Sequence, residues 1–231
     1  MHLIFENDDF AVVYKNENIG FHNELENDET HNGFFSLIKS EFKTLIFPVH
    51  RLDKITSGIL LVAKSSTIAS ELSRQFETGK IEKIYFAITT GQPKLKSGTI
   101  TGDLIKSRDS KWMLSRSTDS PSITIFNSIK IQGKYRFFII RPITGKTHQI
   151  RVALKSNRTP VYGDELYNNS ILTGQTPDRA YLHCYSIRFT LSDKNYYFNC
   201  EPRSGILFSN LLSVHRDIIN EKIKKLSDVS I

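Results

Sequence analysis

The sequence has few cysteines and none in a metal-binding or redox spacing. Cys184 and Cys200 lie in strand-like surroundings without a Cys-x-x-Cys motif, so we expect two buried thiols and no disulfide framework. Neighbouring residues of a strand point to opposite faces, which argues against a joint metal site of His183 and Cys184. We therefore expect neither a metal nor another cofactor.

Long apolar runs are also missing, and the first ten residues contain Glu6, Asp8 and Asp9. A secretory signal and a transmembrane helix are therefore not expected, and the chain is predicted to be cytoplasmic without membrane contact. Positive charge is in excess, because 31 Lys and Arg face 24 Asp and Glu, a net charge of +7. This balance favours an anionic partner such as nucleic acid, although many proteins with solvated lysines bind none.

Strand-like runs dominate the 231 residues, a length sufficient for one domain spanning 1–231. Helical spacing occurs at 65–78, with Gly79 as its stop, at 147–155 and at 206–226. The predicted strands are 10–14, 58–63, 84–89, 123–129, 135–141, 181–191 and 196–200.

One segment, from residue 50, reads His-Arg-Leu-Asp-Lys-Ile-Thr-Ser-Gly and leads into the apolar run 59–63. Asp53 lies there between Arg51 and Lys54, before a tight turn predicted at 56–58. The cations favour a charged carboxylate and attract a polyanion, and such a carboxylate can act as nucleophile or base. Asp53 is the leading catalytic candidate, whereas the structural alternative is an Asp that caps the turn and pairs with an arginine.

The pattern His-Arg-Leu-Asp-x-x-Thr-Ser-Gly-x-Leu-Leu resembles the signature of the RluA-type RNA pseudouridine synthases, in which the Asp is catalytic. Four further segments resemble the same family and occur in its order along most of the chain. They are 7–22, the Lys-Ile-Tyr-Phe-Ala-Ile of 83–88, the Thr-Gly-Lys-Thr-His-Gln-Ile-Arg of 144–151, and a split segment comprising 160–164 and 179–184.

The resemblance implies a catalytic trio of Asp53, Tyr85 and Arg151. Tyr85 matches a tyrosine that contacts the target uracil, and Arg151 matches the arginine that pairs with the aspartate. The expected RNA-binding residues are His50, Arg51, Lys83, Lys146 and His148.

Four positions depart from the family pattern. Asn16 replaces a proline, Lys146 stands where arginine is more common, Ala153 where histidine is frequent, and Asn168 where glycine often follows a tyrosine. None of these changes removes a catalytic group.

The resemblance further implies an α+β fold, with a curved, largely antiparallel mixed β-sheet, flanking helices and a central RNA-binding cleft. It implies a monomeric isomerase that converts a uridine of a ribosomal or transfer RNA stem-loop to pseudouridine. The motifs begin by about residue 7, so an N-terminal S4 domain is not expected. Asp53 would attack the ribose C1′ or the uracil C6, or act as a base at the sugar. The target must be flipped out of its stack, and Arg51 is the residue expected to fill the gap.

Two other functions stay open on the sequence alone. A catalytically silent RNA-binding or assembly factor would share the fold, although retention of the trio favours the enzyme. A hydrolase using Asp53 with His50 or His148 lacks a Gly-rich phosphate loop and paired metal carboxylates. The basic segment 91–121, around Trp112, fits an RNA-gripping excursion or a solvated hairpin anchored by that tryptophan equally well. The acidic segment 24–30 is expected to face away from RNA.

Overall fold

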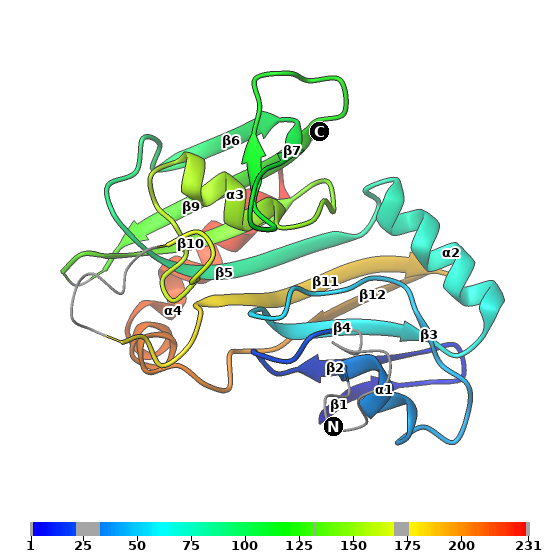
Figure 1. The fold of residues 1–231 in the computed structure, drawn as a ribbon. Helices are drawn as coiled ribbons and strands as arrows, with labels where there is room; N and C mark the ends of the chain where they lie inside the picture. The colour runs from blue at the N-terminus through cyan, green and yellow to red at the C-terminus, as the bar shows by residue number, and fades with distance from the viewer. Residues whose placement is uncertain (1, 22–32, 132, 169–175, 230–231) are drawn as a thin grey trace.

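The computed structural model describes residues 2–21, 33–131, 133–168 and 176–229 (Figure 1), so the acidic segment 24–30 lies outside the described residues. The strands are β1 (His2–Glu6), β2 (Phe10–Lys15), β3 (Phe47–Pro48), β4 (Ser57–Ala63), β5 (Glu82–Thr90), β6 (Ser97–Gly102), β7 (Leu104–Lys106), β8 (Trp112–Leu114), β9 (Ser122–Lys130), β10 (Tyr135–Pro142), β11 (Leu182–Leu191) and β12 (Lys194–Asn199). The helices are α1 (Phe34–Lys39), α2 (Ser66–Glu77), α3 (Gln149–Ser156) and α4 (Ile206–Ser227).

Within the described ranges, ten strands form one sheet in the order β1-β2-β4-β11-β5-β10-β9-β6, with β12 paired to β11 and β3 to β4. The remaining pair, β7 and β8, is a separate antiparallel hairpin. No helix of the described chain is long and apolar enough to cross a membrane. This mostly antiparallel sheet with few helices confirms the predicted α+β class.

Every predicted strand and helix is present, with ends shifted by one or two residues. The predicted turn at 56–58 is misplaced, because Ser57 and Gly58 already belong to β4. The turn instead spans 53–56, where the Thr56 N–H donates to the Asp53 carbonyl oxygen over 3.0 Å. The short elements β1, α1, β3 and β6 to β8 were not predicted, because exposed edge strands and single-turn helices lack a sustained apolar period.

The centre of the sheet is a short parallel contact between β4 and β11, where Ser57 pairs with His183 and Gly58 with Cys184. Gly58 has φ of +120°, and a Cβ there would lie 2.2 Å from the Cys184 carbonyl oxygen. Only glycine allows the two backbones to approach so closely. The 50–58 motif therefore ends at the point where the two halves of the sheet join.

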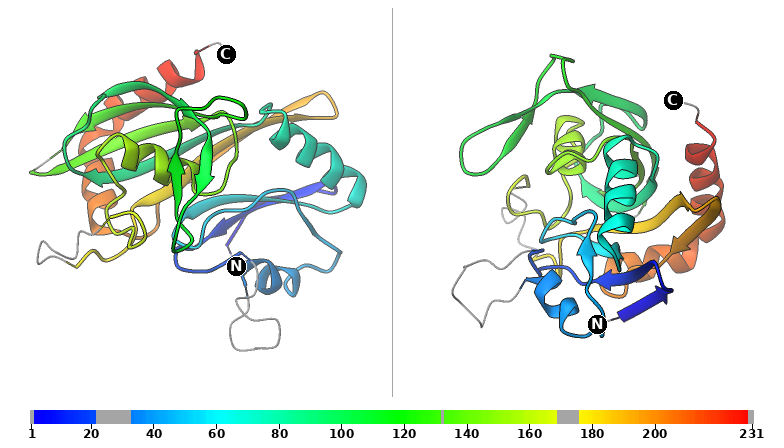
Figure 2. Two further views of the ribbon diagram at one scale, coloured as in Figure 1. Left: turned by 45° about the horizontal axis from the view of Figure 1, so that its top comes forward. Right: turned by 90° about the vertical axis from the view of Figure 1, so that its right-hand side faces the viewer.

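The two faces of the sheet have separate apolar cores. On one face, Ile84, Phe86 and Ile88 of β5 pack with Phe208 and other residues of α4. Helices α2 and α3 pack on the opposite face, as Figures 1 and 2 show. Because side chains alternate along a strand, Lys83 and Tyr85 point away from α4, toward the face that carries α3.

Candidate active site

Asp53 lies in the loop between β3 and β4, and its side chain is 24% exposed. It lines a cavity of about 90 Å³. The rigid β4 strand begins four residues later, so the loop is held at its C-terminal end. The same cavity contains other residues that the sequence selected, namely Arg51, Lys83, Tyr85, Lys146 and His148.

Arg151 reaches the site from the buried helix α3 and contacts two carboxylates. Its Nη1 donates to Asp53 Oδ2 over 3.3 Å, whereas its Nε and Nη2 donate to the two oxygens of Asp164 over 2.7 and 2.8 Å. Burial opposes the charge of Arg151, but the hydrogen bonds and charge of Asp164, together with Asp53, outweigh it and raise the pKa of Arg151. The structure thus brings the predicted pair together and adds a second, closer partner.

Asp164 was not selected as a site residue, although the Gly-Asp turn that contains it was recognised in the sequence. Its side chain is fully buried. The turn requires Gly163, which has φ of +82° and whose Cβ would lie 2.2 Å from the Arg179 carbonyl oxygen. A buried Asp beside an invariably charged Arg is the signal that could have identified the pair, but it is visible only in three dimensions.

Tyr85 and Lys83 extend from the same face of β5 into the cavity. Burial raises the pKa of Tyr85 well above its usual value, and the neighbouring Cys184 thiol adds to this shift. Burial lowers the pKa of Lys83, and its Nζ lies 5.5 Å from the centroid of the Phe76 ring. The tyrosine hydroxyl is therefore protonated near neutral pH, and the residue lines the cavity that a ligand would enter.

His50 and Arg51 differ sharply in their surroundings. His50 Nε2 accepts a hydrogen bond from the Leu61 N–H over 2.9 Å, and its ring stacks on Phe76. Burial lowers the pKa of His50 to about 3, so the imidazole is neutral near pH 7. Arg51 is exposed, and its Nη2 donates to Thr147 Oγ1 over 3.2 Å. Because Nε2 of His50 is already occupied, the hydrolase alternative loses one of its two candidate bases.

Lys146 and His148 lie on the loop before α3. Lys146 Nζ donates to the carbonyl and hydroxyl oxygens of Ser120. Helix α3 begins at Gln149, two residues later than predicted, because His148 has a left-handed backbone with φ of 56°. Lys146 also lines a neighbouring cavity of about 580 Å³, which extends past Arg51 and Lys83 toward the end of α2.

Lys15 is fully buried beneath the loop that carries Asp53. Its Nζ donates to the carbonyl oxygens of Asp53, Lys54 and Thr56 over 3.3, 3.2 and 2.8 Å. Burial lowers the pKa of Lys15 to about 7. Lys15 lies in the 7–22 segment, and the sequence indicated no role for it, because these three carbonyl oxygens lie about forty residues further along the chain.

Comparison with known proteins identifies the family. A family model described as RNA pseudouridylate synthase matches residues 9–156, which contain the Asp53, Tyr85 and Arg151 motifs. The chain belongs to the RNA pseudouridylate synthase family. It is an RNA pseudouridine synthase, an isomerase, in agreement with the resemblance read from the motifs.

Several relatives show the extent of the match. An uncharacterized RNA pseudouridine synthase of Haemophilus influenzae is 37% identical over 204 residues, 88% of either chain. Ribosomal large subunit pseudouridine synthase C of Vibrio parahaemolyticus is 35% identical over 61% of this chain and 46% of its own length. Human RNA pseudouridylate synthase domain containing 4 has the same fold, with a TM-score of 0.72 and 19% identity over 93% of both chains. The chain spans about half the length of the synthase C that it matches.

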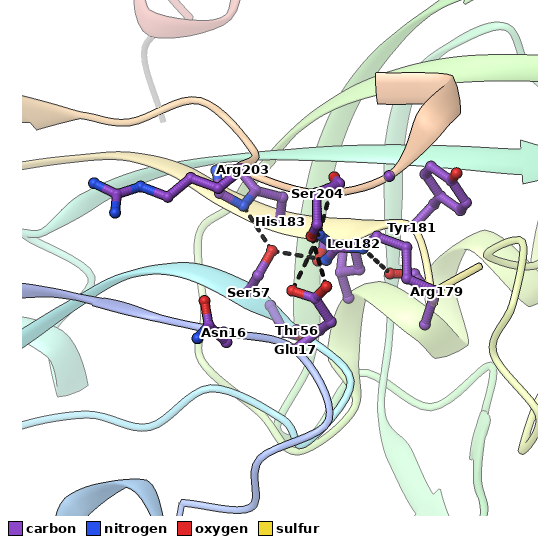
Figure 3. Close-up of polar contacts among 12 residues, drawn as sticks. Asn16, Glu17, Thr56, Ser57, Arg179, Tyr181, Leu182, His183, Arg203 and Ser204 are labelled. Atoms are coloured by element: carbon purple, nitrogen blue, oxygen red, sulfur yellow. Dashed lines mark hydrogen bonds and ion pairs between the residues drawn. The ribbon is translucent and has the colours of Figure 1, made fainter. Parts of the chain in front are cut away.

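A second buried network lies under the start of β4 in this synthase, as Figure 3 shows. Arg179 Nη2 donates to Ser57 Oγ over 2.7 Å, and its Nη1 lies 3.3 Å from Glu17 Oε2 and 2.8 Å from Ser204 Oγ. Ser57 Oγ is also 2.8 Å from His183 Nδ1. The network therefore ties the first residue of β4 to the N-terminal loop and to the segment before α4.

His183 completes this network as a neutral group. Its Nε2 lies 2.9 Å from the Cys200 carbonyl oxygen, which can only accept, so Nε2 carries the proton and Nδ1 accepts from the Ser57 hydroxyl. Burial lowers the pKa of His183 to about 3. Among the described residues, no group of His, Cys, Asp and Glu is arranged to hold a metal ion.

Proposed function

We propose that this enzyme converts a specific uridine in structured ribosomal or transfer RNA to pseudouridine, with Asp53 as the catalytic residue. One observation carries the proposal: among the described residues that line the 90 Å³ cavity, Asp53 supplies the sole carboxylate. It lies beside Tyr85 in that cavity and is paired with Arg151. A carboxylate, a base-stacking ring and a cation are thus brought together where a flipped base would enter.

The reaction breaks the bond between uracil N1 and ribose C1′ and forms a bond between C5 and C1′, while C5 loses its proton and N1 takes one up. Asp53 would attack C1′ or C6, or act as a base at the sugar. Arg151 reaches only Oδ2 of Asp53, which leaves the carboxylate partly exposed to a substrate. In each path Arg151 stabilises the charge of Asp53 and fixes its direction.

Tyr85 would stack on the flipped uracil. Burial raises the pKa of Tyr85, so the phenol remains protonated in the working pH range. This favours ring stacking over acceptance of the C5 proton. Offset stacking of an aromatic side chain on a base needs no charge on either partner.

The remaining cleft residues would bind the RNA. Arg51 makes one hydrogen bond from an exposed position and can leave it to fill the space of the flipped uridine. Lys83 and Lys146 would contact phosphates or sugar oxygens, because both ammonium groups line the two adjoining cavities. His148 lines the floor of the smaller cavity, and His50 supports the wall through its contact with Phe76.

Relatives named as ribosomal large subunit pseudouridine synthases make ribosomal RNA the first substrate to test. A single domain that acts as a monomer in the cytoplasm remains our prediction. The rival proposal, a silent RNA-binding or assembly factor, predicts the same basic cleft without turnover at Asp53.

Pseudouridine mapping tests this function directly. Total RNA is taken from cells lacking the gene and from the same cells complemented with wild type or Asp53→Asn, then mapped by carbodiimide modification and primer extension. We expect one site to disappear in the deletion strain and to return with wild type alone. Restoration of the site by Asp53→Asn would overturn the catalytic role of Asp53. Persistence of every pseudouridine site in the deletion strain would favour the catalytically silent RNA-binding factor.

A further inference from the structure

Tyr167 lies between the catalytic arginine and the basic hairpin formed by β7 and β8. It follows the Gly-Asp turn and is 5% exposed. Its ring centroid lies 4.9 Å from the guanidinium carbon of Arg151 and 5.4 Å from Lys155 Nζ. An aromatic face at this distance attracts the guanidinium and limits its movement. Arg151 is therefore held by the Asp164 carboxylate and by the Tyr167 ring.

The hydroxyl of Tyr167 has different partners. It accepts a hydrogen bond from the backbone N–H of Trp112 over 2.8 Å, and it lies 3.0 Å from His148 Nδ1. Burial raises the pKa of Tyr167 and lowers that of His148, so a protonated phenol meets a neutral imidazole. The hydroxyl can therefore accept from strand β8 and donate to His148, the residue just before α3.

The hairpin that this hydroxyl reaches is basic. Between 104 and 116 it carries four cations, Lys106, Arg108, Lys111 and Arg116, against the single carboxylate Asp109. Lys106 and Arg108 are exposed, and the hairpin lies across α3 on the cleft side of the sheet (Figures 1 and 2). Such a strip of cations beside the cavity suits the phosphates of RNA that flank an inserted base.

The segment after the hairpin is fixed to the rim of the cavity. Asp103 accepts hydrogen bonds from the Ser117 hydroxyl and from the N–H groups of Asp119 and Ser120. Ser120 in turn accepts from Lys146 of the cavity wall. The hairpin and the segment that follows it are thus attached at two points, at Tyr167 and at Ser120.

We propose that Tyr167 is a positioning residue with two separable roles. Its ring aligns Arg151 with Asp53, and its hydroxyl holds the basic β7–β8 hairpin in the position where the hairpin contacts RNA. The inference rests on the proposed function and extends it to a residue and a surface outside the catalytic trio. It assigns the basic segment 91–121 to RNA contact, with Trp112 acting through its backbone.

Two substitutions separate the parts. The probe is bulk RNA labelled with [5-³H]uridine, from cells lacking the gene, because exchange at C5 releases tritium to water. Tyr167→Phe keeps the ring, so we expect kcat within about twofold of wild type and KM raised about fivefold through the lost hydrogen bond. Tyr167→Leu removes the ring as well, and we expect kcat to fall by at least about tenfold.

A double-mutant cycle tests whether the hydroxyl acts through the hairpin. Lys106→Gln with Arg108→Gln is made in wild type and in Tyr167→Phe, and Lys222→Gln with Lys224→Gln on α4 is the control that also removes two positive charges. We expect the hairpin substitutions to raise KM several-fold in the wild-type background and by a smaller factor in Tyr167→Phe. The control substitutions should leave KM unchanged. Thermal unfolding of each variant checks that it is folded.

Each part has an outcome that overturns it. Equal kcat for Tyr167→Leu and Tyr167→Phe would overturn the role of the ring. Additive effects in the cycle, or a Tyr167→Phe defect confined to kcat, would overturn the role of the hydroxyl. If Tyr167→Leu does not fold, Tyr167→Met provides the ring-free variant. Absence of tritium release by wild type would instead count against the proposed function, which separates the two failures.

Discussion

The loop that carries Asp53 has two sides with opposite character. On the cleft side, Asp53 is partly exposed, and Arg51 makes one hydrogen bond from an exposed position. On the underside, Lys15 is fully buried and donates to three loop carbonyls, while Asp164 is fully buried and holds Arg151 through two bonds. Rigidity therefore comes from the buried groups, whereas the groups that we propose to react keep bonding capacity for a substrate.

The largest effect is expected from Asp53→Asn. If Asp53 reacts and does not support the fold, tritium release should fall by at least about 10³-fold. The free energy of unfolding in urea should stay within about 1 kcal/mol of wild type, because the contact with Arg151 is single and partly exposed. A variant that loses activity and stability together would contradict the division between the two sides.

Asp164→Asn tests the buried ion pair between Asp164 and Arg151. Arg151 would remain buried without its close counter-charge, so the free energy of unfolding should fall by about 3–5 kcal/mol. Activity should fall by up to about 10²-fold, because Arg151 is no longer held beside Asp53. Urea denaturation and tritium release measure the two effects. Wild-type stability in Asp164→Asn would show that the buried carboxylate does not anchor the arginine.

Acid should weaken the fold through two neutral histidines, His50 and His183. The unfolded chain takes up protons at His50 and His183 near pH 6.5, whereas burial keeps both folded-state pKa values at about 3. The free energy of unfolding should therefore decrease as the pH falls from 6.5 toward 3, by at most about 1.4 kcal/mol per pH unit for each histidine.

His183→Asn measures the contribution of one histidine to this pH dependence. The variant lacks the titrating imidazole, so the slope of its unfolding free energy against pH should be shallower than that of wild type. Urea denaturation at several pH values between about 4 and 7 supplies both slopes. Parallel slopes would mean that His183 does not resist protonation in the folded chain.

The smallest effect on stability is expected from Arg51→Ala, on the cleft side. Unfolding should change by less than about 0.5 kcal/mol. Activity on a structured RNA should fall about tenfold, because the vacated stack is left empty, while activity on an unpaired target should change little. An equal loss of activity on both RNAs would show that Arg51 does not fill the vacated stack.

The sequence was most informative where structure depends on near neighbours. The apolar run after Gly58 predicts a buried strand, and the spacing of Ile68, Leu72 and Phe76 predicts α2. The motifs around Asp53, Tyr85 and Arg151 identified the family. A hairpin within 91–121 was one of two interpretations of the sequence, but its strands β7 and β8 were not assigned, because three residues each give no measurable period.

What the sequence alone determined is the set of candidate groups, the regular elements that carry them and the family to which the chain belongs. Tertiary structure decided how those groups are used. Arg151 was predicted to pair with Asp53, yet its two shorter bonds go to Asp164, and His50 was predicted at the RNA surface, yet its ring lies against Phe76. The physical reason is that helix and strand periodicity are local properties of the chain, whereas hydrogen-bond partners, burial and shifted pKa values arise only when distant segments meet.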